Sequence, residues 1–368
     1  KEYRRQRQMC IRDSCGSCGC NCDCGSRGQS ERGNALERTC VVTTLESHIH
    51  AVVAYFALGQ VQTITPLQPG FVAHAHRVQT TTHDVMVKTY DRTRAITARM
   101  LEYAPFYLQV TDYLATQTPV HGRIGAPLAC PDGTFLYDDT QFVSAVFAYL
   151  PGITPRNNPL TTAQHCDMAT TVGLIHQVSA QVPLPVPARI ETFVPRWDTH
   201  WADMLGRDWG QLPSAVQQQL QPYRASLQLL HQRLHGVAQY LQSHPLPMVL
   251  CHSDIHGWNV IVQDDRTWLI DFEGLVLAPA EQDLFCWYSD AAWPAVFATY
   301  QQVVGGHTVH PQAMYFYQIK RYLEDIYEWV VELCDARLAP TLRQEYTTLM
   351  QENLSYCAHM CNKTGHTV

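Results

Sequence analysis

Hydrophobic and polar positions alternate with a two-residue period over residues 61–90 and follow a helical period over much of the second half of the chain. The alternating region predicts three antiparallel strands, one through Ile64, one over Ala73–Val78 and one over Val85–Thr89. A Pro-x-x-Gly turn with Gly70 at its tip would link the first two strands. We therefore expect a small antiparallel sheet in the first half of the chain.

Helices and weaker strands complete this half. A short helix is predicted over Thr43–Gly59, where glycine ends the helical pattern. A second is predicted over Pro105–Thr116, because proline is favoured at the first helical position. Residues 124–131 and 133–139 have the composition of two strands joined by a Pro-Asp-Gly turn, and a further apolar run ends at Gly152.

The second half predicts helices and few strands. Thr161 and Gln164 have capping-box spacing and would begin a helix that runs to about Val178. Residues 221–242 and 311–336 repeat their apolar side chains at helical spacing. The strand signals of this half are confined to the short runs MVLC, VIV and WLIDF.

This order of elements indicates an α+β fold with two lobes. The N-lobe is predicted over residues 41–150 and is small and β-rich, and the C-lobe over residues 151–368 is larger and mainly helical. Apolar residues make up 46% of the chain and charged residues 16%, which is enough apolar material for a buried core. No apolar run approaches the roughly 20 residues of a membrane helix, and the first forty residues lack an apolar signal region. We expect a cytoplasmic monomer or dimer with no membrane partner.

Charge and cysteine set residues 1–40 apart from the remainder. This segment carries a net charge of +3 and seven of the 14 cysteines, whereas the remainder carries −10. An acidic body argues against a nucleic-acid partner and is compatible with a cationic small substrate. The run CGSCGCNCDCG has Cys-x-x-Cys spacing but no second pair at zinc-finger distance. We expect residues 1–40 to be a disordered or non-native tail; MCIRDS within it could be translated adapter sequence.

The densest chemistry lies in the stretch CHSDIHGWNVIVQDDRTWLIDFEG, from Cys251 to Gly274. If VIV and WLI pair as a hairpin, the loop before the first strand and the loop after the second meet at one end. Asp254, Asn259 and Asp271 would then converge. Three oxygen donors suit Mg²⁺, and a spare carboxylate beside a metal suits transfer of a phosphoryl group to a hydroxyl. Asp254 is the predicted base, and Asn259 and Asp271 are the predicted metal ligands.

These motifs resemble those of the aminoglycoside phosphotransferase family, whose fold is protein-kinase-like. HSDIHGWN is similar to the family's catalytic loop and IDFEG to its metal-binding segment, with DIHGWN and DFEG closest to the spectinomycin-phosphotransferase-like branch. The resemblance implies that Lys88 binds the α- and β-phosphates of ATP. It also implies that Ala148 and Tyr149 belong to the hinge that receives adenine, and that Asp283 braces the catalytic loop.

Other positions are assigned less directly. The phosphate loop has a single glycine, Gly70, and Glu102 is the expected acidic partner of Lys88. Glu273 could touch a second metal. His252 is expected to be structural, and His256 is expected to be loop scaffold because Mg²⁺ prefers oxygen.

Glu324 and Asp325 could recognise a cationic acceptor or form a solvated helix face. The resemblance implies an ATP-dependent kinase acting on the hydroxyl of a small molecule, such as an aminoglycoside or spectinomycin-like antibiotic. The alternatives are a metabolic kinase for homoserine, choline or a sugar, and a nucleotide-binding pseudoenzyme.

Overall fold

The computed structural model describes residues 44–67, 73–156, 158–185, 188–195, 197–336, 338 and 340–362. The predicted tail at residues 1–40 and the phosphate-loop glycine Gly70 lie outside the described residues. Within the described part, no helix is long and apolar enough to cross a membrane.

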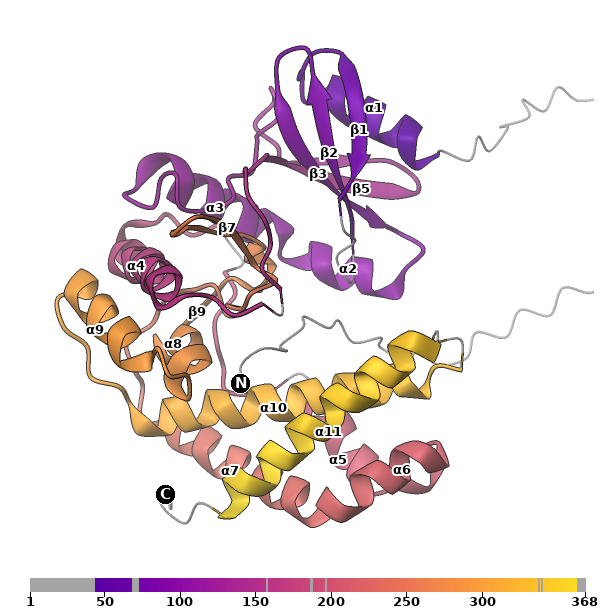
Figure 1. The fold of residues 1–368 in the computed structure, drawn as a ribbon, viewed down its shortest axis with the longest axis vertical. Helices are drawn as coiled ribbons and strands as arrows, with labels where there is room; N and C mark the ends of the chain where they lie inside the picture. Colours follow the sequence, from indigo (N-terminus) through magenta and orange to yellow (C-terminus); the bar gives the residue numbers. More distant parts are fainter. Residues whose placement is uncertain are drawn as a thin grey trace, which may run out of the picture.

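The N-lobe is a five-stranded antiparallel sheet in the order β1-β2-β3-β5-β4, with helix α1 packed against it (Figure 1). Alternation along the strands sends Val78, Val85, Val87 and Val146 into one core beneath α1. The three strands predicted over residues 61–90 are confirmed, and so is the helix that precedes them. The bounds are α1 Leu45–Tyr55, β1 Val61–Pro66, β2 His74–Thr80, β3 Asp84–Asp91, β4 Leu136–Asp138 and β5 Phe142–Ala148.

One predicted strand is wrong. Residues 124–131 form no strand of the sheet and make only isolated bridges, Ile124 with Leu269 and Pro127 with Phe147. Proline has no N–H to donate to a ladder, so Pro127 and Pro131 in this run prevent continuous pairing.

Two helices connect β3 to β4: α2 (Ala95–Glu102) and α3 (Ala104–Gln117), which confirms the helix predicted at Pro105. The buried face of α3, including Phe106 and Leu114, joins the large core of the C-lobe rather than the core under α1. The lobe boundary at residue 150 stays a prediction.

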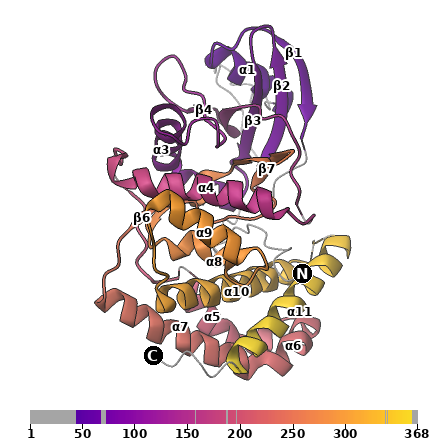
Figure 2. The ribbon, with the colours of Figure 1, turned by 60° about the vertical axis from the view of Figure 1, so that its left-hand side comes forward.

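The C-lobe is built of helices that stack below the sheet (Figures 1 and 2). The Thr161–Gln164 capping box is present at the start of α4, as predicted. The bounds are α4 Thr162–Val178, α5 Asp198–Leu205, α6 Ser214–Leu220, α7 Arg224–Ser243, α8 Glu281–Tyr288, α9 Trp293–Val304, α10 Pro311–Cys334 and α11 Pro340–Asn362.

Two small two-stranded sheets complete the C-lobe. The predicted hairpin is confirmed: β7 (Val260–Gln263) pairs antiparallel with β8 (Arg266–Leu269), with Val260 opposite Leu269. In the second sheet β6 (Val249–Cys251) pairs with β9 (Val276–Ala278). Both sheets have their ends at the loop that carries Asp254.

Candidate active site

The hairpin brings the two predicted metal-ligand positions to one end. The Ile270 N–H donates to the Asn259 carbonyl at 3.0 Å, so the chain entering β7 and the chain leaving β8 run side by side. Asp271 then adopts a left-handed conformation with φ 69° and ψ 63°. A residue other than glycine holds this conformation only where its surroundings enforce it. The hairpin thus turns Asp271 out of the strand direction at the same end as Asn259.

Asp254 is buried, and three side chains hold its carboxylate. Asn259 Nδ2 donates to Oδ2 at 2.8 Å, and Arg321 Nη1 donates to Oδ1 at 3.0 Å. The third is His256, whose Nδ1 accepts from the Trp258 N–H, so its Nε2–H can donate to Oδ2 at 3.2 Å. The carboxylate is therefore fixed in orientation before any substrate arrives.

The same contacts decide the charge of Asp254. Burial alone would raise its pKa, but the interactions with His256 and with the Arg321 guanidinium outweigh burial and hold the pKa below its usual value. Asp254 is therefore ionised at neutral pH, and both of its carboxylate oxygens can accept hydrogen bonds.

A buried aspartate fixes the backbone of this loop. Asp283 Oδ1 accepts from the Ser253 N–H at 2.7 Å, and Oδ2 accepts from the His252 N–H at 2.9 Å. Ser253 has a φ of 70°, a strained value that these two hydrogen bonds help to hold. His252 adds two further ties: its Nδ1 accepts from the Asp254 N–H at 3.3 Å and its Nε2 donates to the Ile270 carbonyl at 2.9 Å. Asp283 and His252, which the sequence analysis expected to have structural roles, thus both make hydrogen bonds to the backbone of this loop.

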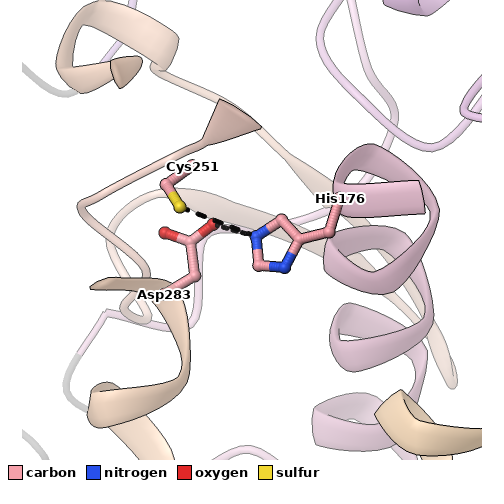
Figure 3. Close-up of side chains that lie close together, drawn as sticks. All are labelled: His176, Cys251 and Asp283. Carbon is pink, nitrogen blue, oxygen red and sulfur yellow. Dashed lines mark hydrogen bonds and ion pairs between the residues drawn. The ribbon is translucent and has the colours of Figure 1, made fainter. Parts of the chain in front are cut away.

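A second layer supports Asp283 (Figure 3). His176 of α4 points at Asp283 and Cys251, with Nε2 3.1 Å from Asp283 Oδ2 and 3.8 Å from Cys251 Sγ. The Tyr300 hydroxyl donates to His176 Nδ1 at 2.9 Å, which leaves the Nε2–H for Asp283. The loop is thereby tied to α4, α8 and α9, and its geometry depends on the packing of three helices.

Lys88 reaches from β3 of the N-lobe to the residues after the hairpin. Its Nζ lies 3.0 Å from Asp271 Oδ1 and 2.5 Å from Glu273 Oε1, and the Tyr90 hydroxyl also donates to Glu273 Oε1. Burial alone would lower the pKa of Lys88, but the charges of Asp271 and Glu273 outweigh it and raise the pKa. Burial raises the pKa of Glu273. Lys88 is therefore a permanent cation at the point where both lobes meet.

The remaining predicted nucleotide residues have different surroundings. Glu102 is the last residue of α2 and is exposed. The ion pairs described for Lys88 join the lysine to Asp271 and Glu273. A pairing of Lys88 with Glu102 stays a prediction. At the hinge, the Ala148 N–H donates to the Ala126 carbonyl and the Tyr149 N–H donates to the Asp84 carbonyl. Adenine binding at Ala148 and Tyr149 would therefore use their other atoms.

The two predicted acceptor-binding acids differ in access. Asp325 is buried, lies 3.0 Å from Arg321 Nε through Oδ1, and accepts from Asn353 Nδ2 at 3.3 Å. Burial raises the pKa of Asp325 to about 7 in spite of the Arg321 charge. Glu324 is only partly buried. Recognition of an acceptor by these residues stays a prediction, and Glu324 is the more accessible of the two.

Arg321 and Tyr90 were not found from the sequence, although each contacts a predicted site residue. Arg321 lies 67 positions from Asp254, so no local motif connects them. The four-residue spacing of Arg321 and Asp325 on one helix is typical of an ion pair, but it gives no sign of the contact between Arg321 and Asp254. Tyr90 follows Lys88 by two positions on one strand, and this period-two spacing places both on the same face of the sheet.

Comparisons with known proteins identify a family and a fold. A family model described as the phosphotransferase enzyme family matches residues 63–317. No curated protein sequence matches the chain.

Several solved structures share the fold. A spectinomycin phosphotransferase in complex with ADP and spectinomycin aligns with a TM-score of 0.67 and 17% identity, covering 86% of this chain and 98% of the other. An amicoumacin kinase in complex with AMP-PNP and Ca²⁺ aligns with a TM-score of 0.58 and 14% identity, covering 86% of this chain and 94% of the other. A microcompartment-associated aminopropanol kinase aligns with a TM-score of 0.56 and 14% identity, covering 84% of this chain and 97% of the other. At these identities the likeness shows the fold, which is the bilobal kinase-like α+β fold expected from the sequence.

The family match is more specific than the likeness of fold. It spans more than half of the chain and contains Lys88, Asp254 and Asp271, the three charged residues that the fold brings to the junction of the lobes. The chain therefore belongs to the phosphotransferase enzyme family.

Proposed function

We propose that this phosphotransferase moves the γ-phosphate of ATP to a hydroxyl of a small molecule, with Asp254 as the base. Lys88 would bind the α- and β-phosphates, and Asn259 and Asp271 would hold Mg²⁺. One observation carries the proposal: a buried, oriented and ionised Asp254 shares one end of a hairpin with Asp271, which in turn contacts Lys88 of the other lobe.

The role of Asp254 follows from its contacts. Phosphoryl transfer passes through a loose transition state, so the acceptor oxygen needs correct placement more than early deprotonation. Asn259 and His256 occupy Oδ2, which leaves Oδ1, shared with Arg321, to accept the hydroxyl of the acceptor. A carboxylate with a low pKa suits this task, because it orients the hydroxyl throughout and takes its proton only as the new bond forms.

The residues present fit a hard divalent cation. In the described structure the hydrogen bonds of the Asn259 side chain are made through its amide nitrogen, so the amide oxygen is the atom left to face a metal. With the carboxylates of Asp271 and Glu273 the donor set is all oxygen, which is the set that Mg²⁺ prefers. When bound, Mg²⁺ supplies positive charge that offsets the charge of the phosphates.

Lys88 bridges Asp271 and Glu273 in this structure, and we propose that nucleotide changes this arrangement. Phosphate oxygens would compete with the two carboxylates for the ammonium group. Glu273 would keep its hydrogen bond from the Tyr90 hydroxyl when Lys88 turns away. With Mg²⁺ bound beside them, the two acids would not be left as unpaired buried charges.

For the acceptor we propose a small antibiotic of the spectinomycin or aminoglycoside type, and hence a role in antibiotic resistance in the cytoplasm. The support is the similarity to a spectinomycin phosphotransferase and the acidic residues of α10 near Asp254. A metabolic acceptor is the second candidate, and the similarity to an aminopropanol kinase favours it.

The test is direct detection of a phosphorylated product. The full chain is incubated with ATP, MgCl₂ and single acceptors, including spectinomycin, kanamycin, choline, homoserine and aminopropanol, and ³¹P NMR follows the phosphate ester. We expect one acceptor class to give an ester in equal amount with ADP. A protein that binds ATP yet phosphorylates none of a broad hydroxyl panel would be a pseudoenzyme and would contradict the proposal.

A further inference from the structure

Three metal-ligating side chains converge far from Asp254, where α5 meets α7. Asp198 is the first residue of α5, and His231 and His235 lie one turn apart on α7. His231 Nε2 is 2.7 Å and His235 Nε2 is 3.0 Å from Asp198 Oδ1, and the two nitrogens are 3.2 Å apart. The three possible ligand atoms therefore lie within 3.2 Å of one another.

We propose that Asp198, His231 and His235 form a zinc site that pins α5 to α7. Zinc takes imidazole nitrogen and carboxylate oxygen at about 2 Å. An ion at that distance from all three atoms would sit about 1 Å above the plane that they define, on one side of the triangle. Two histidines four apart on a helix with a carboxylate from another element are a three-ligand zinc set that keeps a fourth position open.

The surroundings suit this metal. Buried Trp201 lies beside His231, with ring centroids 6.2 Å apart and the planes tilted by 47°, and limits the space available to the imidazole. The side chain of His235 is 47% exposed, so the open side of the set faces solvent, where water can complete a tetrahedron.

The other compact cluster in the described part of the chain does not have these features. His176, Cys251 and Asp283 are fully buried, and their polar atoms are already used (Figure 3). Asp283 accepts hydrogen bonds from two backbone N–H groups, and Cys251 Sγ contacts the carbonyls of Ala278 and Pro279. That cluster has no open position and braces the loop, whereas the Asp198 set has its three ligand atoms turned toward one another.

A metal here would have a structural consequence. The start of α5 is joined to α7 by these three side chains, and the end of α5 is joined to it by Arg224, which donates to the Leu205 carbonyl at 2.6 Å. Zinc would replace hydrogen bonds at the first point by coordination. Since it binds only the folded arrangement, it would stabilise the C-lobe against unfolding.

The test counts bound zinc. The full chain is freed of metal and titrated with ZnCl₂ against a chromophoric chelator, beside His235→Ala, His231→Ala and the control His244→Ala, an exposed histidine stacked on Tyr240. Any zinc bound by the cysteines of residues 1–40 would be common to all four proteins. We expect His235→Ala and His231→Ala to bind one equivalent fewer, or at least about tenfold more weakly, and His244→Ala to match the wild type.

His235→Ala is the decisive variant, because His235 is the most exposed of the three and its loss leaves the core intact. Zinc should raise the Tm of the wild type and of His244→Ala by more than it raises the Tm of His235→Ala. Cobalt in place of zinc gives an independent reading, since the signal lost in His235→Ala should lack a thiolate charge-transfer band. Equal stoichiometry, affinity and Tm response in all four proteins would overturn the proposal.

Discussion

Asp254 is a carboxylate whose properties are set by its neighbours. Its spacing from Asn259 and Asp271 was sufficient to predict that the three converge, because the hairpin between them is local. The sequence did not show Arg321, since a contact between residues 67 positions apart depends on how α10 packs on the loop. The partners of Lys88 were missed for the same reason: Asp271 and Glu273 come from the other lobe.

Arg321→Met should affect both stability and the pH profile. Loss of one partner of a buried ion pair leaves Asp254 and Asp325 uncompensated, so the free energy of unfolding at pH 7 should fall by about 3 kcal/mol. Without Arg321 the pKa of Asp254 rises, and the acidic limb of the kcat profile should move to higher pH. Urea denaturation and pH–rate measurements check both.

Arg207→Met is the matched control, because Arg207 also pairs with an acid four positions away but its side chain is 74% exposed. Its stability should change by no more than about 0.5 kcal/mol. Equal effects of the two substitutions would show that the Arg321 contacts are energetically unimportant.

Because of Asp325, we expect part of the free energy of unfolding to fall as the pH rises, which is unusual for a carboxylic acid. Its pKa in the folded protein is about 7, above the value for an unfolded chain, because burial outweighs Arg321. The folded state then binds more protons than the unfolded state between about pH 4 and 7, so this group makes stability fall as pH rises through that window. The groups facing Asp325 are Arg321 and Glu324 of α10, Asp254 of the loop, and Asn353 of α11.

Asp325→Asn should remove this dependence. The wild type should lose up to about 4 kcal/mol more than the variant between pH 4 and pH 8, measured by urea denaturation at several pH values. Histidine titrations are common to both proteins and cancel in the difference. Parallel stability profiles would mean that Asp325 is ionised throughout.

At the scale of elements, local patterns predicted the sheet of the N-lobe, the capping box of α4 and the β7–β8 hairpin. The strand expected over residues 124–131 failed, because two prolines interrupt its ladder. Short elements such as α5, α8 and β9 were not predicted, because three to eight residues carry too little periodicity and these elements exist through their packing.

Substitution of Gly257 would test how closely the loop that carries Asp254 packs against the chain at Arg156. A Cβ on Gly257 would lie 2.3 Å from the Arg156 carbonyl oxygen, and Arg156 itself has a φ of 56° and donates its N–H to the Gly257 carbonyl. Gly257→Ala should therefore push the two segments apart, lower stability by about 1–3 kcal/mol and reduce kcat.

Gly236 is the comparison, because a Cβ there meets no atom within 4 Å and the residue lies inside α7. Gly236→Ala should raise the free energy of unfolding by about 0.5–1 kcal/mol without changing kcat. Thermal denaturation and steady-state kinetics of both variants decide the point; an unaffected Gly257→Ala would show that the contact relaxes freely.

At the scale of the whole molecule, the site is assembled from both lobes. Lys88 comes from the sheet, Asp254 from the loop after β6, Asp271 from the end of β8, and Arg321 from α10 (Figure 1). The two-lobed α+β architecture was predictable, because the change from a two-residue to a helical period marks it in the sequence. The depth of α3 in the large core was not, since its buried face could have packed on either lobe.

The measurement that tests the central claim most directly is single-turnover transfer of labelled γ-phosphate to an acceptor by the wild type, Asp254→Asn and Asp265→Asn. Asp265 is an exposed aspartate in the β7–β8 turn and serves as the control. We predict that Asp254→Asn binds ATP as the wild type does but transfers phosphate at least about 10²-fold more slowly, while Asp265→Asn is unchanged. Transfer by Asp254→Asn at the rate of the wild type would contradict the assignment of Asp254 as the base.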